Sequence, residues 1–318
     1  MRFPVLHGLQ KTNKEKGEII MELGKGIIPA LLTPFTETEE VDYEALRAHT
    51  RSLMEFGVQG IFCLGTNGEF YALTESEKLK ITETVVDEVN GKIPVYAGSG
   101  EISTRTVIRL TNQFQKLGVS AVSVITPYFI HPSQHELYEH YGRIAGETNL
   151  PVILYNIPMR THVNMEPETV AELAENFSGI IGIKDSSGNI EQIKRYIDIT
   201  PESFKVLSGD DGLILDTLLL GGTGAISGTA NVIPDILVNL YHAFLEGDIK
   251  KARMLQDRIA PLRADGKLGT SPGVVKLQAN LAGCPVGKCR MPIRMDDPEA
   301  VETMRKNLER YYGIPMGK

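Results

Sequence analysis

The residues with the clearest chemical potential are a lysine, a tyrosine and an arginine that end or follow short apolar runs of the sequence. Lys184 ends the run GIIGIK. An ammonium at the mouth of an apolar sheet is partly desolvated, which lowers its pKa and frees the neutral amine. A neutral amine attacks ketones to form Schiff bases, so Lys184 is a candidate nucleophile. Tyr155 ends the run PVILY and could relay a proton, and Arg160 could bind a carboxylate through two parallel hydrogen bonds.

A glycine-rich turn offers a second set of binding groups. The turn at residues 65–69 (GTNGE) follows another apolar run and would present backbone N–H groups and a hydroxyl to an anion such as a small carboxylate. Such turns are common after strands, and a solvent-facing lysine, a packed tyrosine and a solvated arginine would fit the other positions equally well. The individual residues therefore leave a structural interpretation open beside the catalytic one.

Eight apolar runs of strand length alternate with amphipathic stretches of helical length, and these elements must position the candidate residues. The runs are IIPALL (27–32), VQGIFCL (58–64), IPVYAG (93–98), VSAVSVI (119–125), PVILY (151–155), GIIGI (179–183), FKVL (204–207) and GAIS (224–227). Parallel strands covered by helices are apolar on both faces, as these runs are. Eight strand–helix units predict a (β/α)8 TIM barrel with its active site at the carboxyl ends of the strands; an open doubly wound sheet is the alternative.

The helical stretches carry recognisable end signals and continue beyond the eighth unit. Thr74 and Glu77 form a predicted capping box, and Gly118 is a candidate C-cap. Three more helical patterns, KKARMLQDRIAPLRA, PGVVKLQANL and PEAVETMRKNLERYY, predict a C-terminal helical extension. We therefore expect an N-terminal arm at residues 1–20, a catalytic barrel at 21–247 and a C-terminal helical domain at 248–318.

The composition excludes several classes of function. The 318 residues include 33 Lys and Arg against 40 Asp and Glu, and the net charge of −7 argues against a nucleic-acid-binding surface. No apolar run reaches the roughly 18 residues of a membrane-spanning helix. The first residues lack the apolar core and cleavage site of a signal peptide, so we expect a cytoplasmic protein.

The cysteines and histidines do not predict a metal site or a disulfide. The cysteines are Cys63, Cys284 and Cys289, with no CxxC pair among them. The first lies in an apolar run and is expected to be inert core, and the other two lie in a loop with nothing nearby in the sequence to make them nucleophilic. The histidines that lie close together are expected on a surface helix face: His131, His135 and His140.

Six motifs, in this order, make the chain resemble the dihydrodipicolinate synthase / N-acetylneuraminate lyase family of class I, pyruvate-dependent aldolases. They are ALLTPF, GTNGEFYALTESEK, TPYF-x-x-PSQ, ILYNIPMRT, GIKDSSGN and SGDD…LGGTGAISGTANV. The match runs from about Gly26 to Ala230 and continues more weakly into the helical tail. It implies a (β/α)8 barrel with a C-terminal helical domain, usually a homotetramer built as a dimer of dimers. It also implies a lyase or aldolase reaction with no metal and no organic cofactor.

The resemblance implies specific roles for the candidate residues. Lys184 matches the lysine that forms the imine with pyruvate, and Tyr155 matches the tyrosine that shuttles protons. Thr66 matches the hydroxyl that links this tyrosine into a relay, and with the backbone at Asn67 it would hold the pyruvate carboxylate. The protonated imine is an electron sink, so the pyruvate methyl becomes acidic and the resulting enamine can attack an aldehyde or be released by retro-aldol cleavage.

The substrate-binding positions favour one reaction within the family. Gly209 and Ile226 match backbone positions that line the pyruvate pocket. Arg160 matches the arginine with which dihydrodipicolinate synthases bind the carboxylate of aspartate semialdehyde. We therefore expect a 4-hydroxy-tetrahydrodipicolinate synthase-type condensation of pyruvate with aspartate semialdehyde, a step of lysine biosynthesis.

Two departures keep alternatives open. Asn67 stands where synthases usually have a second threonine, which is more similar to 4-hydroxy-2-oxoglutarate aldolases. Phe129 replaces a second tyrosine that the family contributes across the dimer to the proton relay. The first alternative is therefore an aldolase or dehydratase of a hydroxylated or deoxy 2-oxo acid, such as 4-hydroxy-2-oxoglutarate or a 2-keto-3-deoxy sugar acid. A non-catalytic barrel that binds an oxo acid is the second.

Overall fold

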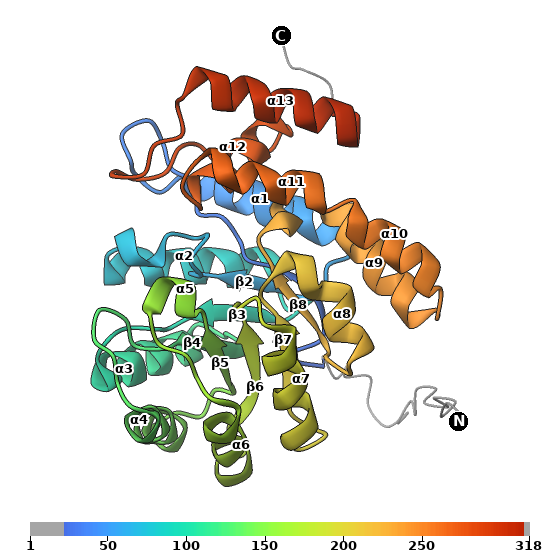
Figure 1. Cartoon of the computed structure of the whole chain (residues 1–318). Coiled ribbons are helices and arrows are strands. Elements are labelled where there is room, and N and C mark those ends of the chain that lie inside the picture. The colour runs from blue at the N-terminus through green and yellow to red at the C-terminus, as the bar shows by residue number, and fades with distance from the viewer. Residues whose placement is uncertain (1–21, 315–318) are drawn as a thin grey trace.

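The computed structural model describes residues 22–314, and in this part of the chain eight parallel strands form a barrel (Figure 1). The strands are β1 (Gly26–Pro29), β2 (Ile61–Cys63), β3 (Val95–Gly98), β4 (Ala121–Ile125), β5 (Val152–Asn156), β6 (Ile180–Asp185), β7 (Lys205–Ser208) and β8 (Gly224–Ser227). β8 pairs with β1, and a parallel bridge between Ala30 and Phe62 brings β1 to β2 and completes the ring. The predicted (β/α)8 barrel is confirmed. The open doubly wound sheet is wrong because its two edge strands would not meet.

Each predicted apolar run overlaps one of these strands, because the strands are buried on both faces. The inside of the barrel is filled by side chains that include Ile28, Phe62, Tyr96, Ile153 and Leu207. A larger apolar layer lies between the strands and the surrounding helices. Burial on both sides explains why the runs are apolar throughout and do not alternate with polar residues.

Helices surround the barrel and are positioned by their end signals. They are α1 (Tyr43–Glu55), α2 (Glu75–Val89), α3 (Thr104–Lys116), α4 (Gln134–Glu147), α5 (Pro158–Thr161), α6 (Pro167–Asn176), α7 (Ile190–Ile199), α8 (Ile214–Leu219) and α9 (Pro234–Leu245). The capping box before α2 is confirmed: the Glu77 N–H donates to the Thr74 hydroxyl and the Thr74 N–H donates to the Glu77 carboxylate. Gly118 follows α3 with a left-handed φ of 88°, as expected of a glycine that ends a helix.

The predicted helical extension is present and lies against the barrel. Its helices are α10 (Ile249–Asp257), α11 (Ala260–Ala264), α12 (Gly273–Leu281) and α13 (Pro298–Tyr312). Figure 1 shows α11, α12 and α13, in orange and red, stacked over one end of the molecule near α1. α12 packs against the 3-10 helix Thr229–Asn231, which directly follows β8. The extension therefore reaches the carboxyl ends of the strands.

One expectation about a single side chain is wrong. His140 is not on a surface face: it is buried between α4 and α3, where its Nδ1 lies 2.8 Å from the Thr104 hydroxyl and burial lowers its pKa to about 4. The expectation that Cys284 is not activated as a nucleophile is confirmed. Its Sγ lies 2.9 Å from Nδ1 of the buried His49, but burial raises the pKa of the thiol to about 11.

The N-terminal arm predicted at residues 1–20 lies outside the described residues. Between residues 22 and 314, no helix has the length and apolar character needed to cross a membrane.

Candidate active site

Lys184 and Tyr155 lie side by side at the carboxyl ends of two neighbouring strands. The register of β5 and β6 places the two residues directly opposite each other. The Lys184 Nζ lies 4.0 Å from the centre of the Tyr155 ring and 5.3 Å from the centre of the Phe62 ring. Lys184 and Tyr155 are only 5% and 4% exposed. An amine and a phenol therefore share a space largely shielded from water, where the amine can attack a carbonyl and the phenol can pass a proton.

Gly209 makes room for the lysine at the end of β7. Its N–H donates to the Asp185 carbonyl at 2.6 Å, which fixes the backbone close to the end of β6. A Cβ atom at this position would lie 2.9 Å from Cε of Lys184 and would also clash with the Ser186 hydroxyl. Any side chain here would therefore displace the amine.

The glycine-rich turn after β2 brings a hydroxyl and an amide to the same place. The Thr33 hydroxyl donates to the Gly68 carbonyl at 2.7 Å and anchors the turn. The Asn67 side chain lies against the backbone of Gly228, where a Cβ atom would come within 2.5 Å of the amide nitrogen. The Thr66 hydroxyl is buried and has no hydrogen-bond partner within residues 22–314. Because buried polar atoms normally have partners, this hydroxyl is available to a bound substrate.

These residues surround one cavity of about 380 Å³. Its lining includes all seven residues predicted from the sequence: Lys184, Tyr155, Thr66, Asn67, Arg160, Gly209 and Ile226. The volume lies within the range typical of small-molecule sites. The structure thus brings together side chains that are far apart in the sequence.

Arg160 lies on the exposed rim of this cavity, on the short helix α5. Its Nη2 donates to the Ser271 carbonyl at 3.4 Å. Arg263, on α11, lies on the same rim and forms an ion pair with Asp210 at 2.5 Å. Ser271 and Arg263 could not be predicted from the sequence, because nothing in the helical pattern indicates that the extension folds back over the carboxyl ends of the strands.

A buried polar network behind the lysine holds the ends of β5 and β6 together. The Asp185 carboxylate accepts hydrogen bonds from the Asn156 side chain at 2.9 Å, the Ser187 N–H at 2.9 Å and the Gln192 side chain at 3.3 Å. Asn156 also donates to the Asn164 side chain at 2.9 Å. A network whose members are satisfied is rigid, so it fixes the strand ends that carry Tyr155 and Lys184.

The predicted proton relay needs a hydrogen bond between the hydroxyls of Thr66 and Tyr155, and residues 22–314 do not contain this bond. Because the Thr66 hydroxyl has no partner among the described residues, no hydrogen bond joins it to the Tyr155 hydroxyl there. Phe129 is 89% exposed. Ser186 supplies another buried hydroxyl without a partner in residues 22–314, and it lines the cavity. Ser186 follows Lys184 by two residues in the motif KDSS, and this spacing could have identified it from the sequence.

Across the described residues, no group of three or more His, Cys, Asp or Glu side chains is placed to hold a metal ion. The groups that line the cavity include the Lys184 amine, several hydroxyls, the Asn67 amide and the Arg160 guanidinium, together with carboxylates such as that of Asp210, which is paired with Arg263. This set suits covalent imine chemistry and the binding of carboxylates.

Sequence comparisons find relatives along almost the whole chain. The family model described as the dihydrodipicolinate synthetase family matches residues 23–311. The 4-hydroxy-tetrahydrodipicolinate synthase of Methanopyrus kandleri is 40% identical over 294 residues, which cover 92% of this chain and 98% of that protein. The enzyme of the same name from Methanocaldococcus jannaschii is 41% identical over 269 residues, covering 85% of this chain and 92% of that protein.

Solved structures with the same fold agree with these relatives. The dihydrodipicolinate synthase from Aquifex aeolicus superposes with a TM-score of 0.89 at 36% identity. The superposition covers 92% of this chain and 100% of that chain. YagE from Escherichia coli K12 is a prophage protein of the dihydrodipicolinic acid synthase family whose structure was solved in complex with pyruvate. It gives a TM-score of 0.89 at 33% identity, again covering 92% of this chain and 100% of the other.

Proposed function

This chain belongs to the dihydrodipicolinate synthetase family, and from that premise we propose that it condenses pyruvate with aspartate semialdehyde through an imine on Lys184. The observation that carries the proposal is the pairing of Lys184 with Tyr155 across β5 and β6, 4.0 Å from amine to ring centre. The names of the curated relatives support this condensation, and the pyruvate complex of YagE supports pyruvate as the first substrate.

The chemistry follows from the neighbouring amine and phenol. The Lys184 amine attacks C2 of pyruvate, and loss of one water leaves a protonated imine. The imine draws electrons from the methyl group, which loses a proton and becomes the nucleophilic carbon of an enamine. This carbon attacks the aldehyde, and Tyr155 relays a proton to the oxygen that becomes the hydroxyl. The amino group of the added substrate then attacks the imine carbon, closes the ring and releases Lys184.

The binding groups divide between the two substrates. The free hydroxyl of Thr66 and the backbone N–H of Asn67 would hold the pyruvate carboxylate, with Gly209 and Ile226 lining its pocket. Arg160 on the rim would hold the carboxylate of the aldehyde. The imine itself serves as the electron sink, so we propose a reaction that uses no metal and no organic cofactor.

Borohydride trapping with pyruvate tests this proposal. Reduction should leave one pyruvate adduct per chain, located on Lys184 by peptide mapping. Lys184→Arg keeps the charge but cannot form the neutral amine near pH 7, so it should give no adduct. Folded wild-type protein without an adduct would contradict the imine mechanism.

A second candidate function uses the same imine with another partner. Asn67 departs from the threonine of typical synthases, and the unpartnered Ser186 hydroxyl adds a polar group beside Lys184. Both favour a hydroxylated 2-oxo acid such as 4-hydroxy-2-oxoglutarate, cleaved in the retro-aldol direction. Comparing kcat/KM for aspartate semialdehyde condensation with that for 4-hydroxy-2-oxoglutarate cleavage separates the two functions.

We further propose a cytoplasmic homotetramer, built as a dimer of dimers, with a barrel domain at residues 21–247 and a helical domain at 248–318. The neighbouring side chains of Phe129 and Ile130 are 89% and 51% exposed, which supports a contact between subunits. The chain's net charge of −7 supports neither a nucleic-acid nor a membrane partner.

A further inference from the structure

Glu69 ends the glycine-rich turn in a backbone conformation that needs outside support. Its φ of 55° lies in the left-handed region, and Leu64 at the other end of the turn has a φ of 59°. Residues with a Cβ atom rarely adopt this conformation, because the side chain crowds the backbone. Glu69 is also fully buried, so its carboxylate needs partners. The turn that carries Thr66 and Asn67 is therefore held in place by its surroundings.

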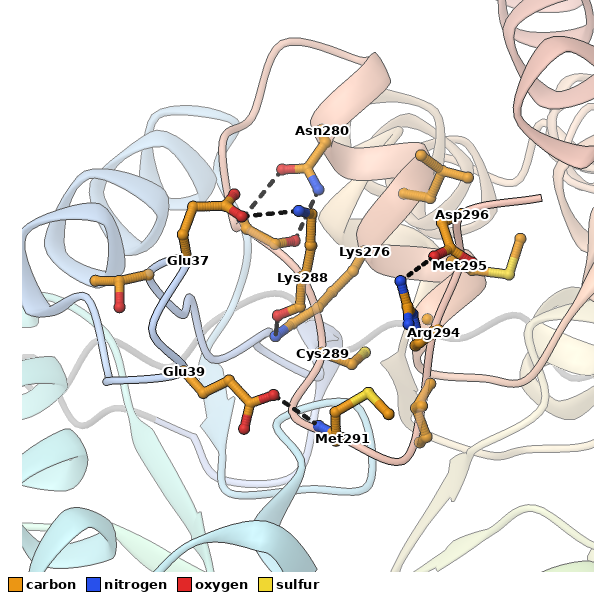
Figure 2. Close-up of a pocket in the computed structure, with 15 residues that line it drawn as sticks. Glu37, Glu39, Lys276, Asn280, Lys288, Cys289, Met291, Arg294, Met295 and Asp296 are labelled. Carbon is orange, nitrogen blue, oxygen red and sulfur yellow. Dashed lines mark hydrogen bonds and ion pairs between the residues drawn. The ribbon is translucent and has the colours of Figure 1, made fainter. Parts of the chain in front are cut away.

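The C-terminal extension supplies these partners. Lys276, on α12, places its Nζ 2.6 Å from Oε1 of Glu69, and the Arg290 N–H donates to Oε2 at 3.0 Å. The Lys276 ammonium also donates to the Lys288 carbonyl at 2.9 Å and lies 4.1 Å from the centre of the Phe35 ring. Figure 2 shows the Lys276 side chain running from α12 to the Lys288 carbonyl. The extension thus supplies an ion-pair partner to Oε1 of Glu69 and a hydrogen-bond donor to Oε2.

Within residues 22–314, the other cations in the wall of the cavity beside Lys276 are already paired. A cavity of about 360 Å³ lies beside it, with Lys288 and Arg294 in its wall (Figure 2). Lys288 pairs with Glu37 at 2.7 Å, and Arg294 pairs with Asp296 at 2.6 Å. Removing the Lys276 charge would leave Glu69 buried without its counter-ion, which is strongly unfavourable.

The support is transmitted directly to the substrate-binding turn. The Glu69 N–H donates to the Thr66 carbonyl at 3.1 Å, so a displaced Glu69 would move Thr66, which lines the cavity. Arg290 extends the same connection beyond the turn, because its guanidinium binds the Glu77 carboxylate at 2.9 and 2.5 Å and the Ala72 carbonyl at 2.9 Å.

We propose that Lys276 and Glu69 are positioning residues, through which the C-terminal extension sets Thr66 and Asn67 for the carboxylate of pyruvate. This inference rests on the proposed function, which assigns that carboxylate to the turn. It gives the extension a role in substrate affinity, although neither Lys276 nor Glu69 lines the catalytic cavity.

Substitutions at the pair should weaken pyruvate binding more than any other step. In Lys276→Met, the pyruvate concentration that half-saturates trapping on Lys184 should rise about tenfold or more, because the carboxylate site is displaced. Glu69→Gln keeps the shape of the side chain and the bond from Arg290, so it should cause a smaller rise. At saturating pyruvate, the KM of the second substrate should change less than about twofold in both variants. Met304→Ala is the control: Met304 is fully buried in α13, which packs against α11 and α12, so the substitution should lower the Tm and leave pyruvate half-saturation unchanged.

Amide hydrogen exchange gives a readout that does not depend on the reaction. Peptides covering residues 64–70 should exchange faster in Lys276→Met than in wild type or in Met304→Ala. If wild-type protein traps no pyruvate, the proposed function fails, while the exchange of residues 64–70 still decides whether the pair holds the turn. The inference is overturned if folded Lys276→Met keeps wild-type exchange in the turn and wild-type pyruvate half-saturation. If that variant does not fold, the same two measurements on Glu69→Gln decide the question.

Discussion

Arg160 presents a planar guanidinium at the rim of the cavity, and its shape should matter more than its charge. Arg160→Lys keeps the charge but loses the two parallel donors that fit a carboxylate, so the KM of aspartate semialdehyde should rise about tenfold. Pyruvate half-saturation in the trapping assay should stay the same. Arg263→Lys is the matched control, because this arginine lies on the same rim but is already paired with Asp210. If both substitutions raised the KM of aspartate semialdehyde equally, the assignment of its carboxylate to Arg160 would be contradicted.

Gly209 is a second residue at which shape decides the outcome. In Gly209→Ala, the new Cβ atom would lie 2.9 Å from Cε of Lys184 and would push the amine away from its position. The rate of adduct formation at saturating pyruvate should fall at least about tenfold. Gly146→Ala on α4, where a Cβ atom would meet nothing within 4 Å, should react at the wild-type rate. If Gly209→Ala formed the adduct at the wild-type rate, the absence of a side chain at this position would not be needed for the reaction of Lys184.

The residues of the cavity could be predicted where a sequence motif ends or follows a strand, and could not be predicted in the C-terminal extension. Lys184, Tyr155 and Arg160 all line the cavity, because a barrel brings the ends of its strands together. The missing hydrogen bond of Thr66 depends on side-chain rotation, which no sequence pattern reports. Arg263 was missed because it comes from the extension, whose path over the barrel depends on tertiary packing.

Among the secondary-structure elements, α1 is tied to the distant end of the chain by a buried histidine. His49 lies 2.9 Å from both the Asn231 side-chain oxygen and the Cys284 sulfur. That oxygen also accepts the Leu32 N–H at 3.3 Å, so it is an acceptor and His49 must donate to it through Nε2. The thiol therefore donates to Nδ1 of a neutral imidazole. Burial lowers the pKa of His49 to about 4.

This neutral histidine should make the fold sensitive to acid. In the unfolded chain the imidazole takes up a proton below its usual pKa of 6.5, while the folded chain resists protonation down to about 4. The contribution of neutral His49 to the free energy of unfolding is fully present above pH 6.5. It is lost as the pH falls toward 4, and this loss amounts to roughly 3 kcal/mol. The Tm of His49→Gln should be lower near pH 7 and should depend less on pH than that of wild type. His135→Gln, at an exposed position on α4, should follow the wild-type curve; parallel curves for all three proteins would contradict the prediction.

Local sequence signals predict the strands and helices themselves, but they do not predict the tertiary contacts between them. Apolar runs locate every strand, and Thr74 with Glu77 marks the start of α2, because burial and capping act over a few residues. The ion pair between Glu69 and Lys276 joins the second strand–helix turn to α12. Neither residue has a local pattern that points to the other, so the sequence alone does not indicate that the extension supports the turn.

For the whole molecule, the exposed apolar residues after β4 matter most. Phe129 is 89% exposed and has a φ of 73°, a strained conformation that persists only where surrounding structure or a partner supports it. Ile130 beside it is half exposed, and Met159 near the cavity is 75% exposed. Two neighbouring exposed apolar side chains, Phe129 and Ile130, are a feature expected of a subunit contact.

Replacing Phe129 with a charged residue should therefore break the assembly. Phe129→Asp would place a carboxylate in the proposed apolar contact, so sedimentation at micromolar concentration should show a species smaller than the proposed wild-type tetramer, with its activity reduced in proportion. Phe56→Ala, at a half-exposed phenylalanine that ends α1, should sediment like wild type. A Phe129→Asp protein that keeps the wild-type mass would place the contact elsewhere on the surface. A monomeric wild type would overturn the proposed tetramer, because the exposed phenylalanine would then be a feature of the single chain.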